Sequence, residues 1–90
     1  MIREPHYSID TESILNKLER GSDTRLLNAV CDALDLICDE GDSAKAREEM
    51  LVTKNGTHIW KTNIKDTRYN WCVLWEPRQE LAIIHYIGEL

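Results

Sequence analysis

Three short runs of mainly apolar residues, separated by polar breaks, follow one another over the last third of the chain. These runs span residues 58–64, 69–75 and 81–87 and are rich in β-branched and aromatic side chains. Polar, turn-forming segments separate them at residues 65–67 and 76–80. This composition and spacing are typical of consecutive strands that pair as hairpins. We therefore predict three strands here.

Upstream, apolar residues recur at the spacing of a helix. The first such segment predicts a helix over residues 11–20, with Asp10 or Thr11 as its N-cap. The second begins at residues 22–23 and ends at Gly41, and its apolar positions form an i, i+3/i+4 series. The link between them is only two or three residues long, which favours an antiparallel helical hairpin. The second helix places these residues toward a core: Leu26, Leu27, Val30, Cys31, Leu34, Ile37 and Cys38.

Three shorter segments complete the pattern. Residues 6–9 alternate and predict an edge strand, and residues 50–53 predict a strand that turns at Asn55-Gly56, a strong hairpin signal. Residues 43–49 fit either a short helix or an extended connection. The order predicts one α+β domain over residues 1–90, a mostly antiparallel sheet of three or four strands packed on an N-terminal helical hairpin. Some of Trp60, Trp71 and Trp75 should share its core. The opposite, open face of the sheet is where a ligand or partner would bind.

Charge is unevenly distributed along the 90 residues. Residues 1–50 hold six Lys/Arg and twelve Asp/Glu, giving −6, and residues 51–90 hold five and four, giving +1, so the sum is the net charge of −5. A general binder of free nucleic acid would instead be basic. No apolar run approaches the roughly 20 residues of a membrane span, and the first residues form no apolar signal region. We therefore expect a cytoplasmic protein.

The three cysteines are Cys31, Cys38 and Cys72. Their number is odd and no pair has the spacing of a CxxC motif, so we expect reduced thiols buried in the core. A metal site that uses Cys72 and His85 has no supporting spacing. The sequence therefore predicts neither a metal nor a cofactor.

The candidate chemistry lies on the predicted sheet, since the sequence contains no Gly-rich phosphate loop and no HExxH motif. Lys61, Lys65 and Arg68 flank the first hairpin of the three strands, and His85 lies near the end of the last. Cations that hold a phosphate, beside an imidazole that moves protons, are what phosphodiester cleavage needs. The alternative interpretation of His85 is a strand histidine that is simply hydrogen-bonded. Glu48 and Glu49 are more typical of a solvated pair than of an acid/base dyad.

The sheet region also carries three short motifs. Residues 59–64 place Trp60 before Lys61, residues 69–75 begin at a tyrosine and continue with apolar residues, and residues 81–88 end in isoleucine and glycine. With the order of strand, helical hairpin and hairpin strands, they resemble the RelE/ParE superfamily of bacterial toxin–antitoxin modules. The resemblance covers most of the chain. It implies a toxin of prokaryotic or phage origin that is neutralised by a cognate antitoxin. It also implies endoribonuclease activity on ribosome-associated mRNA, which inhibits translation.

The sequence departs from this family at two places. Asn70 follows Tyr69 where the ribonucleases of the family have arginine, and the chain ends with Gly88 and two further residues where they have a terminal histidine and arginine. Two hypotheses follow. The first is a RelE/ParE-type toxin, acting as a weak or degenerate endoribonuclease or as a blocker of another cellular target. The second is a non-catalytic acidic interaction protein on the same scaffold, of the immunity type or a phage-encoded inhibitor. Growth arrest on induction discriminates between them.

Overall fold

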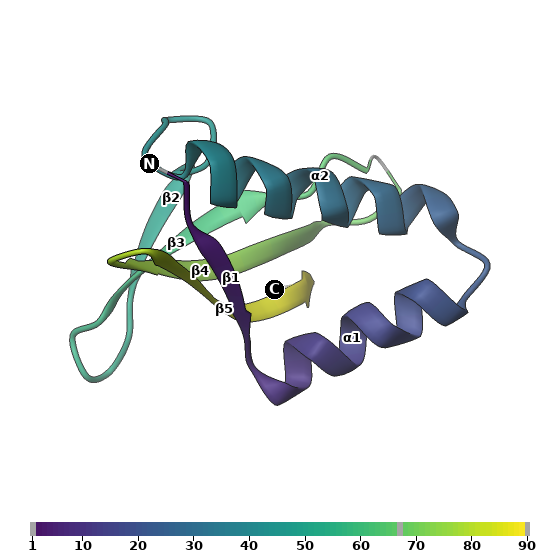
Figure 1. Ribbon diagram of the computed structural model, residues 1–90, viewed down its shortest axis with the longest axis horizontal. Coiled ribbons are helices and arrows are strands. Elements are labelled where there is room, and N and C mark those ends of the chain that lie inside the picture. The colour runs from purple at the N-terminus through teal and green to yellow at the C-terminus, as the bar shows by residue number, and fades with distance from the viewer. Residues whose placement is uncertain (1, 67, 90) are drawn as a thin grey trace.

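The chain folds into a β-sheet with a pair of helices packed on one of its faces. A computed structural model describes residues 2–66 and 68–89. Figure 1 shows the arrangement of their elements. In chain order these are β1 (Glu4–Tyr7), α1 (Ile9–Arg20), α2 (Thr24–Glu40), β2 (Glu49–Val52), β3 (His58–Asn63), β4 (Trp71–Arg78) and β5 (Leu81–Glu89).

The sheet has the strand order β1-β5-β4-β3-β2, and the pairs β2–β3, β3–β4 and β4–β5 are antiparallel. β1 pairs with β5 in parallel, with Tyr7 opposite Ile84. The described residues thus form a mixed sheet of five strands, whereas the sequence predicted three or four mostly antiparallel ones. The difference arises because the two helices carry the chain away from β1 before the last strand returns beside it.

Both helices begin at a side-chain cap. Ser8 caps α1, since its hydroxyl accepts a hydrogen bond from the backbone N–H of Thr11 at 3.2 Å. The prediction of Asp10 or Thr11 as the cap was therefore wrong. Thr11 is instead buried inside the first turn, and its hydroxyl lies 3.4 Å from the carbonyl oxygen of Ile84 in β5. Asp23 caps α2 by accepting from the N–H of Leu26 at 3.1 Å.

β4 is longer than the alternating pattern predicted. It continues through Pro77 to Arg78, so the turn to β5 contains only Gln79 and Glu80. Proline is tolerated in a strand where no ladder bond is needed from its nitrogen. The pairing of β3 with β4 runs only as far as Trp60 opposite Trp75, so Pro77 lies beyond it.

The segment between α2 and β2 forms turns, so it is neither the short helix nor the extended connection that the sequence left open. The Ser43 hydroxyl donates to the carbonyl of Glu40 at 2.7 Å and accepts from the N–H of Ala46 at 3.4 Å. Ala46 is fully buried, and its carbonyl accepts a hydrogen bond from the hydroxyl of Thr62 in β3. These bonds fix the segment against the sheet.

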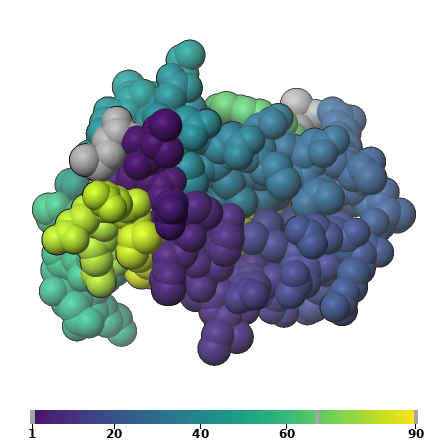
Figure 2. Space-filling model, in the orientation of Figure 1, coloured from purple at the N-terminus to yellow at the C-terminus, as the bar shows by residue number. Residues whose placement is uncertain are grey.

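The core lies between the helices and the sheet. In Figure 2, α1, α2 and β1 cover the middle of the sheet from this side. Trp75 is fully buried, and Trp60 and Trp71 pack against the core at its margin. Leu27 is only half-buried and lies outside the core, contrary to the prediction. The buried cluster includes Leu26, Val30, Leu34 and Ile37 from α2 with Val73, Trp75, Ile84 and Ile87 from the sheet.

Two of the cysteines do not lie where the sequence predicted. Cys31 is exposed and Cys38 is half-buried, while Cys72 is buried. Cys31 and Cys38 each follow a core residue, Val30 and Ile37, and one residue along an α-helix is a rotation of about 100°. They therefore share a face, as predicted, but only Cys38 packs against the margin of the core, and Cys31 is exposed.

Candidate functional site

The side of the sheet away from the helices carries two of the four residues that the sequence singled out, Lys61 and His85. Because side chains alternate along strands, the pairing register places one set of residues on this side, which we call the outer face. No described helix packs on it. Its residues include Leu51, Ile59, Lys61, Leu74, Glu76, Ile83 and Tyr86.

Lys61 lies on the outer face in the middle of β3. It is directly opposite Glu49 of β2, and its ammonium nitrogen is 3.5 Å from Oε2 of that residue. Only about a quarter of the Lys61 side chain is exposed (25%). The neighbouring carboxylate thus neutralises a cation that is partly withdrawn from solvent.

Lys65 begins the loop between β3 and β4. Its nitrogen lies 3.1 Å from Oε1 of Glu48, whose Oε2 accepts a hydrogen bond from the N–H of Asn63 at 2.7 Å. Glu48 and Glu49 therefore bind two different lysines, so they form no acid/base dyad. Lys61, Lys65 and Tyr69 line one hollow of about 510 Å³ at this end of the sheet.

Arg68 connects the β3–β4 loop to the start of α2. Its guanidinium lies 2.7 Å from the carboxylate of Asp66 and 2.9 Å from that of Asp23, and it lies over the ring of Tyr69. Hydrogen bonds from Arg68 lower the pKa of Asp66 to about 2 and also lower the pKa of Asp23. The same two carboxylates raise the pKa of Arg68. This cation is therefore a structural clamp between two parts of the chain.

His85 belongs to a separate cluster on the outer face. The pairing of β4 with β5 shifts between Leu74 and Trp75, which leaves His85 as the extra residue of β5. Its Nε2 lies 2.9 Å from Oε1 of Glu76, and Arg78 donates to the same oxygen at 3.2 Å. This agrees with the alternative interpretation of a hydrogen-bonded strand histidine.

The structure thus brings together two of the four predicted catalytic residues. Lys61 and Lys65 share a hollow with Tyr69. His85 lies two strands from Lys61, about 10 Å across the sheet. Arg68 is directed toward α2 through Asp23. The catalytic roles of these residues remain predictions.

Each of the four predicted residues has a carboxylate within 3.5 Å. Sequence reasoning missed these partners because they come from other segments. Glu49 of β2 faces Lys61 of β3 only once the hairpin register is known, and Asp23 is 45 residues from Arg68. A phosphate that approached these side chains would compete with the carboxylates already bound to them.

Among residues 2–66 and 68–89, no group of His, Cys, Asp and Glu side chains is arranged to hold a metal ion. Neither α1 nor α2 is long and apolar enough to span a membrane, and no other helix is present in the described part of the chain. In comparisons with models of protein families, with curated proteins and with solved structures, nothing matched this chain.

Proposed function

We propose that the chain is a RelE/ParE-type toxin of a toxin–antitoxin module that acts by binding a cellular protein. The observation that carries the proposal is the character of the outer face. Its candidate phosphate-binding side chains are paired internally, Lys61 with Glu49 and His85 with Glu76, while partly exposed apolar side chains lie between these pairs. Apolar surface combined with neutralised charge suits a protein partner better than a phosphate backbone.

The order of the elements supports the toxin part of the proposal. The chain has a short first strand, a helical hairpin and a run of hairpin strands, in that order. This is the order expected from the resemblance to the RelE/ParE superfamily, which the motifs around Trp60, Tyr69 and Gly88 also carry. In this proposal a cognate antitoxin neutralises the protein, and Asn70 stands where the ribonucleases of the family have an arginine, so one of their usual catalytic groups is missing.

Cleavage of ribosome-associated mRNA is the second candidate, and one observation favours it. Lys61, Lys65 and Tyr69 line the same hollow of about 510 Å³, which is large enough for a ligand. Two ammonium groups beside a phenol could hold a phosphate there. For this to occur, Glu48 and Glu49 would have to release the lysines.

Induction in bacterial cells, scored for growth arrest and for new RNA ends, distinguishes the two candidates. The wild type is compared with Lys61→Ala, Arg68→Ala and His85→Ala. We expect growth arrest without RNA cleavage by the wild type, and growth arrest by Lys61→Ala and His85→Ala as well. Arrest should be relieved when the antitoxin reading frame beside the gene is expressed together with the toxin.

Other outcomes would contradict the proposal in different ways. RNA cleavage by the wild type that falls by roughly 10²–10³-fold in Lys61→Ala, the loss expected for one phosphate-stabilising donor, would establish the ribonuclease instead. Glu49→Gln should then raise cleavage, because it frees Lys61. Absence of growth arrest would favour the acidic interaction protein of the immunity or phage-inhibitor type.

A further inference from the structure

β2 is the strand at one end of the sheet, and in the described part of the chain no other strand pairs with its free edge. It pairs antiparallel with β3, and just beyond it the N–H of Thr53 donates to the carbonyl of Thr57 at 2.9 Å. Residues of an antiparallel strand face their neighbour alternately. The backbone groups of Leu51 therefore face β3, while the N–H and C=O groups of Met50 and Val52 point to the free edge.

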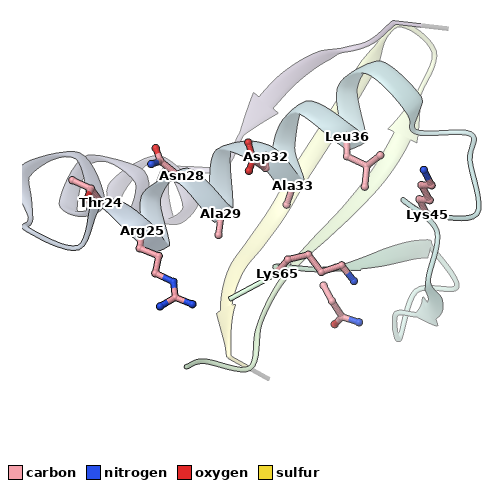
Figure 3. Close-up of a pocket in the computed structure, with 10 residues that line it drawn as sticks. Thr24, Arg25, Asn28, Ala29, Asp32, Ala33, Leu36, Lys45 and Lys65 are labelled. Carbon is pink, nitrogen blue, oxygen red and sulfur yellow. The ribbon is translucent and has the colours of Figure 1, made fainter. Parts of the chain in front are cut away.

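The side chains of these two residues add apolar surface to the edge, since Met50 is 47% and Val52 58% exposed. Both lie on the helix side of the sheet, because Met50 is opposite Trp60 and Trp60 is opposite the core residue Trp75. The helices leave them uncovered. The hollow beside α2 in Figure 3 is lined by α2, the turns after it, β3 and the β3–β4 loop, but by none of the described residues of β2.

The strand at the other end of the sheet, β1, is protected against further pairing. The N–H of Glu4 donates to the carbonyl of Glu80 at 2.9 Å, so residues 4 and 6 face β5. Pro5 therefore faces the free edge, where it has no N–H to donate. Proline at such a position is a typical protection of an edge strand. Of the two end strands in the described sheet, only β2 presents an unprotected edge.

We propose that two copies of the chain form a dimer in which β2 pairs antiparallel with β2 of the other copy. Met50 of one copy lies opposite Val52 of the other, and Leu51 lies at the twofold axis. Both outward residues of each copy are then hydrogen-bonded, and their apolar side chains meet. A register shifted by two residues in either direction would instead place one of these apolar side chains opposite Glu48 or Lys54.

Charge favours a second copy as the occupant of this edge. The proposed register brings Lys54 of each copy opposite Glu48 of the other, and the twofold axis makes this contact occur twice. Lys54 is exposed and forms no ion pair with a described residue of its own chain. Opposite charges across neighbouring strands stabilise their pairing. The lysine at this edge thus acquires a partner only in the dimer.

The dimer is closed and leaves the outer face open. Its two remaining edges are both β1, which Pro5 protects, so no further copy adds to the sheet. The twofold axis is perpendicular to the sheet, so the helices of both copies lie on one side and both outer faces lie on the other. Monomer and dimer therefore present the outer face alike, and this inference is independent of the proposed function.

Sedimentation equilibrium of the full chain over a wide range of concentrations tests the proposal. A short edge buries less surface than the roughly 1,200 Å² of a standard interface, and both copies are acidic, so we expect a Kd of about 10–100 µM. The mean mass should rise with concentration from the 10.5 kDa of one chain toward twice this value.

Variants of the edge should weaken the association. Val52→Pro removes an N–H that β3 does not use and places the proline ring at the free edge, so the Kd should rise at least about tenfold. Lys54→Glu brings like charges together and should also raise the Kd. Lys17→Glu is its control, with the same change of net charge on an exposed position of α1, which packs on α2, β1 and β5. Its Kd should equal that of the wild type, and thermal unfolding establishes that each variant folds.

An engineered disulfide tests the register. Residues that are opposite each other without exchanging hydrogen bonds have Cα atoms about 4.5 Å apart, which a disulfide can span. With the exposed Cys31 replaced by serine, Leu51→Cys should therefore form a covalent dimer in oxidised glutathione. Lys54→Cys is the matched control, since it is exposed at the same edge but would lie about 20 Å from its copy. It should remain a monomer under reducing-agent-free gel electrophoresis.

Three results would overturn the proposal. A mass of 10.5 kDa at every concentration would refute the second copy as the occupant and leave the edge to a strand of a different protein. A folded Val52→Pro protein that associates as the wild type does would place the interface elsewhere. Equal cross-linking of Leu51→Cys and Lys54→Cys would refute the assigned register.

Discussion

Replacement of Thr62 by valine should destabilise the fold through two hydrogen bonds at once. Thr62 is 1% exposed and lies in β3. Its hydroxyl accepts a hydrogen bond from the indole Nε1 of Trp75 at 2.9 Å and donates one to the carbonyl of Ala46. This one group therefore holds the core tryptophan and the turns after α2 to the same strand.

The loss of stability in Thr62→Val can be worked out from the polar groups that the substitution leaves without a partner. Valine has nearly the same shape as threonine, so no cavity forms, but the Trp75 N–H and the Ala46 carbonyl lose their partner in a buried place. A buried polar group without a partner costs about 1–3 kcal/mol, so the two together should lower the free energy of unfolding by about 2–6 kcal/mol. This is a large part of the roughly 5–15 kcal/mol that stabilises an ordinary domain.

Urea unfolding followed by tryptophan fluorescence measures the effect. Thr62→Ser keeps the hydroxyl and loses one methyl group, so it should cost only about 1 kcal/mol. In a Trp75→Phe background the indole donor is absent, and Thr62→Val should then cost less than in the wild type, by about 1–3 kcal/mol. A Thr62→Val protein as stable as the wild type, or an equal cost in both backgrounds, would refute this account of the buried bonds.

Three further predictions concern the core, the β3–β4 loop and the thiols. Leu34→Ala should lower the free energy of unfolding, measured with urea, by about 2–5 kcal/mol, because Leu34 is buried in the core. A cost well below this range would show that Leu34 does not belong to the core. The pKa of Asp66 is lowered from its ordinary 3.8 to about 2, so its ion pair with Arg68 stabilises the fold above about pH 4, and this contribution is lost as the pH falls toward 2. Asp66→Asn should therefore lower the melting temperature at pH 5 more than at pH 2, and an equal difference at both would contradict this. Cys31 should react with a thiol reagent in the native protein and Cys72 only after unfolding, and equal rates would show that their burial is misassigned.

The helices could be predicted from the sequence because their signal is local and repeated. The apolar series of α2 covers four turns, and Asp23 precedes it in the position of a cap. The strands 58–64 and 81–87 were found for a similar reason. β4 was predicted too short, since Pro77 was interpreted as a break, and whether a strand tolerates proline depends on where its neighbour ends.

Pairing between distant segments could not be predicted in this way. The alternation near Tyr7 predicted a strand but carries no information on its partner or direction. The same holds for the site, where Lys61 and Arg68 are recognisable as candidate cations, but their carboxylates come from other elements. Whether a cation is free or neutralised depends on the folded register, and it is this difference that shifts the proposal from RNA cleavage to protein binding.

Growth arrest by an outer-face variant tests the proposed mode of action most directly. Ile83→Glu places a charge among the partly exposed apolar residues of the outer face, whereas Val52→Glu places the same charge at an exposed position on the other side of β2. Both variants are first compared with the wild type in thermal unfolding, to establish that they fold. The account predicts that Ile83→Glu no longer arrests growth while Val52→Glu and Lys61→Ala still do. A folded Ile83→Glu protein as toxic as the wild type, or loss of toxicity in Lys61→Ala alone, would contradict it.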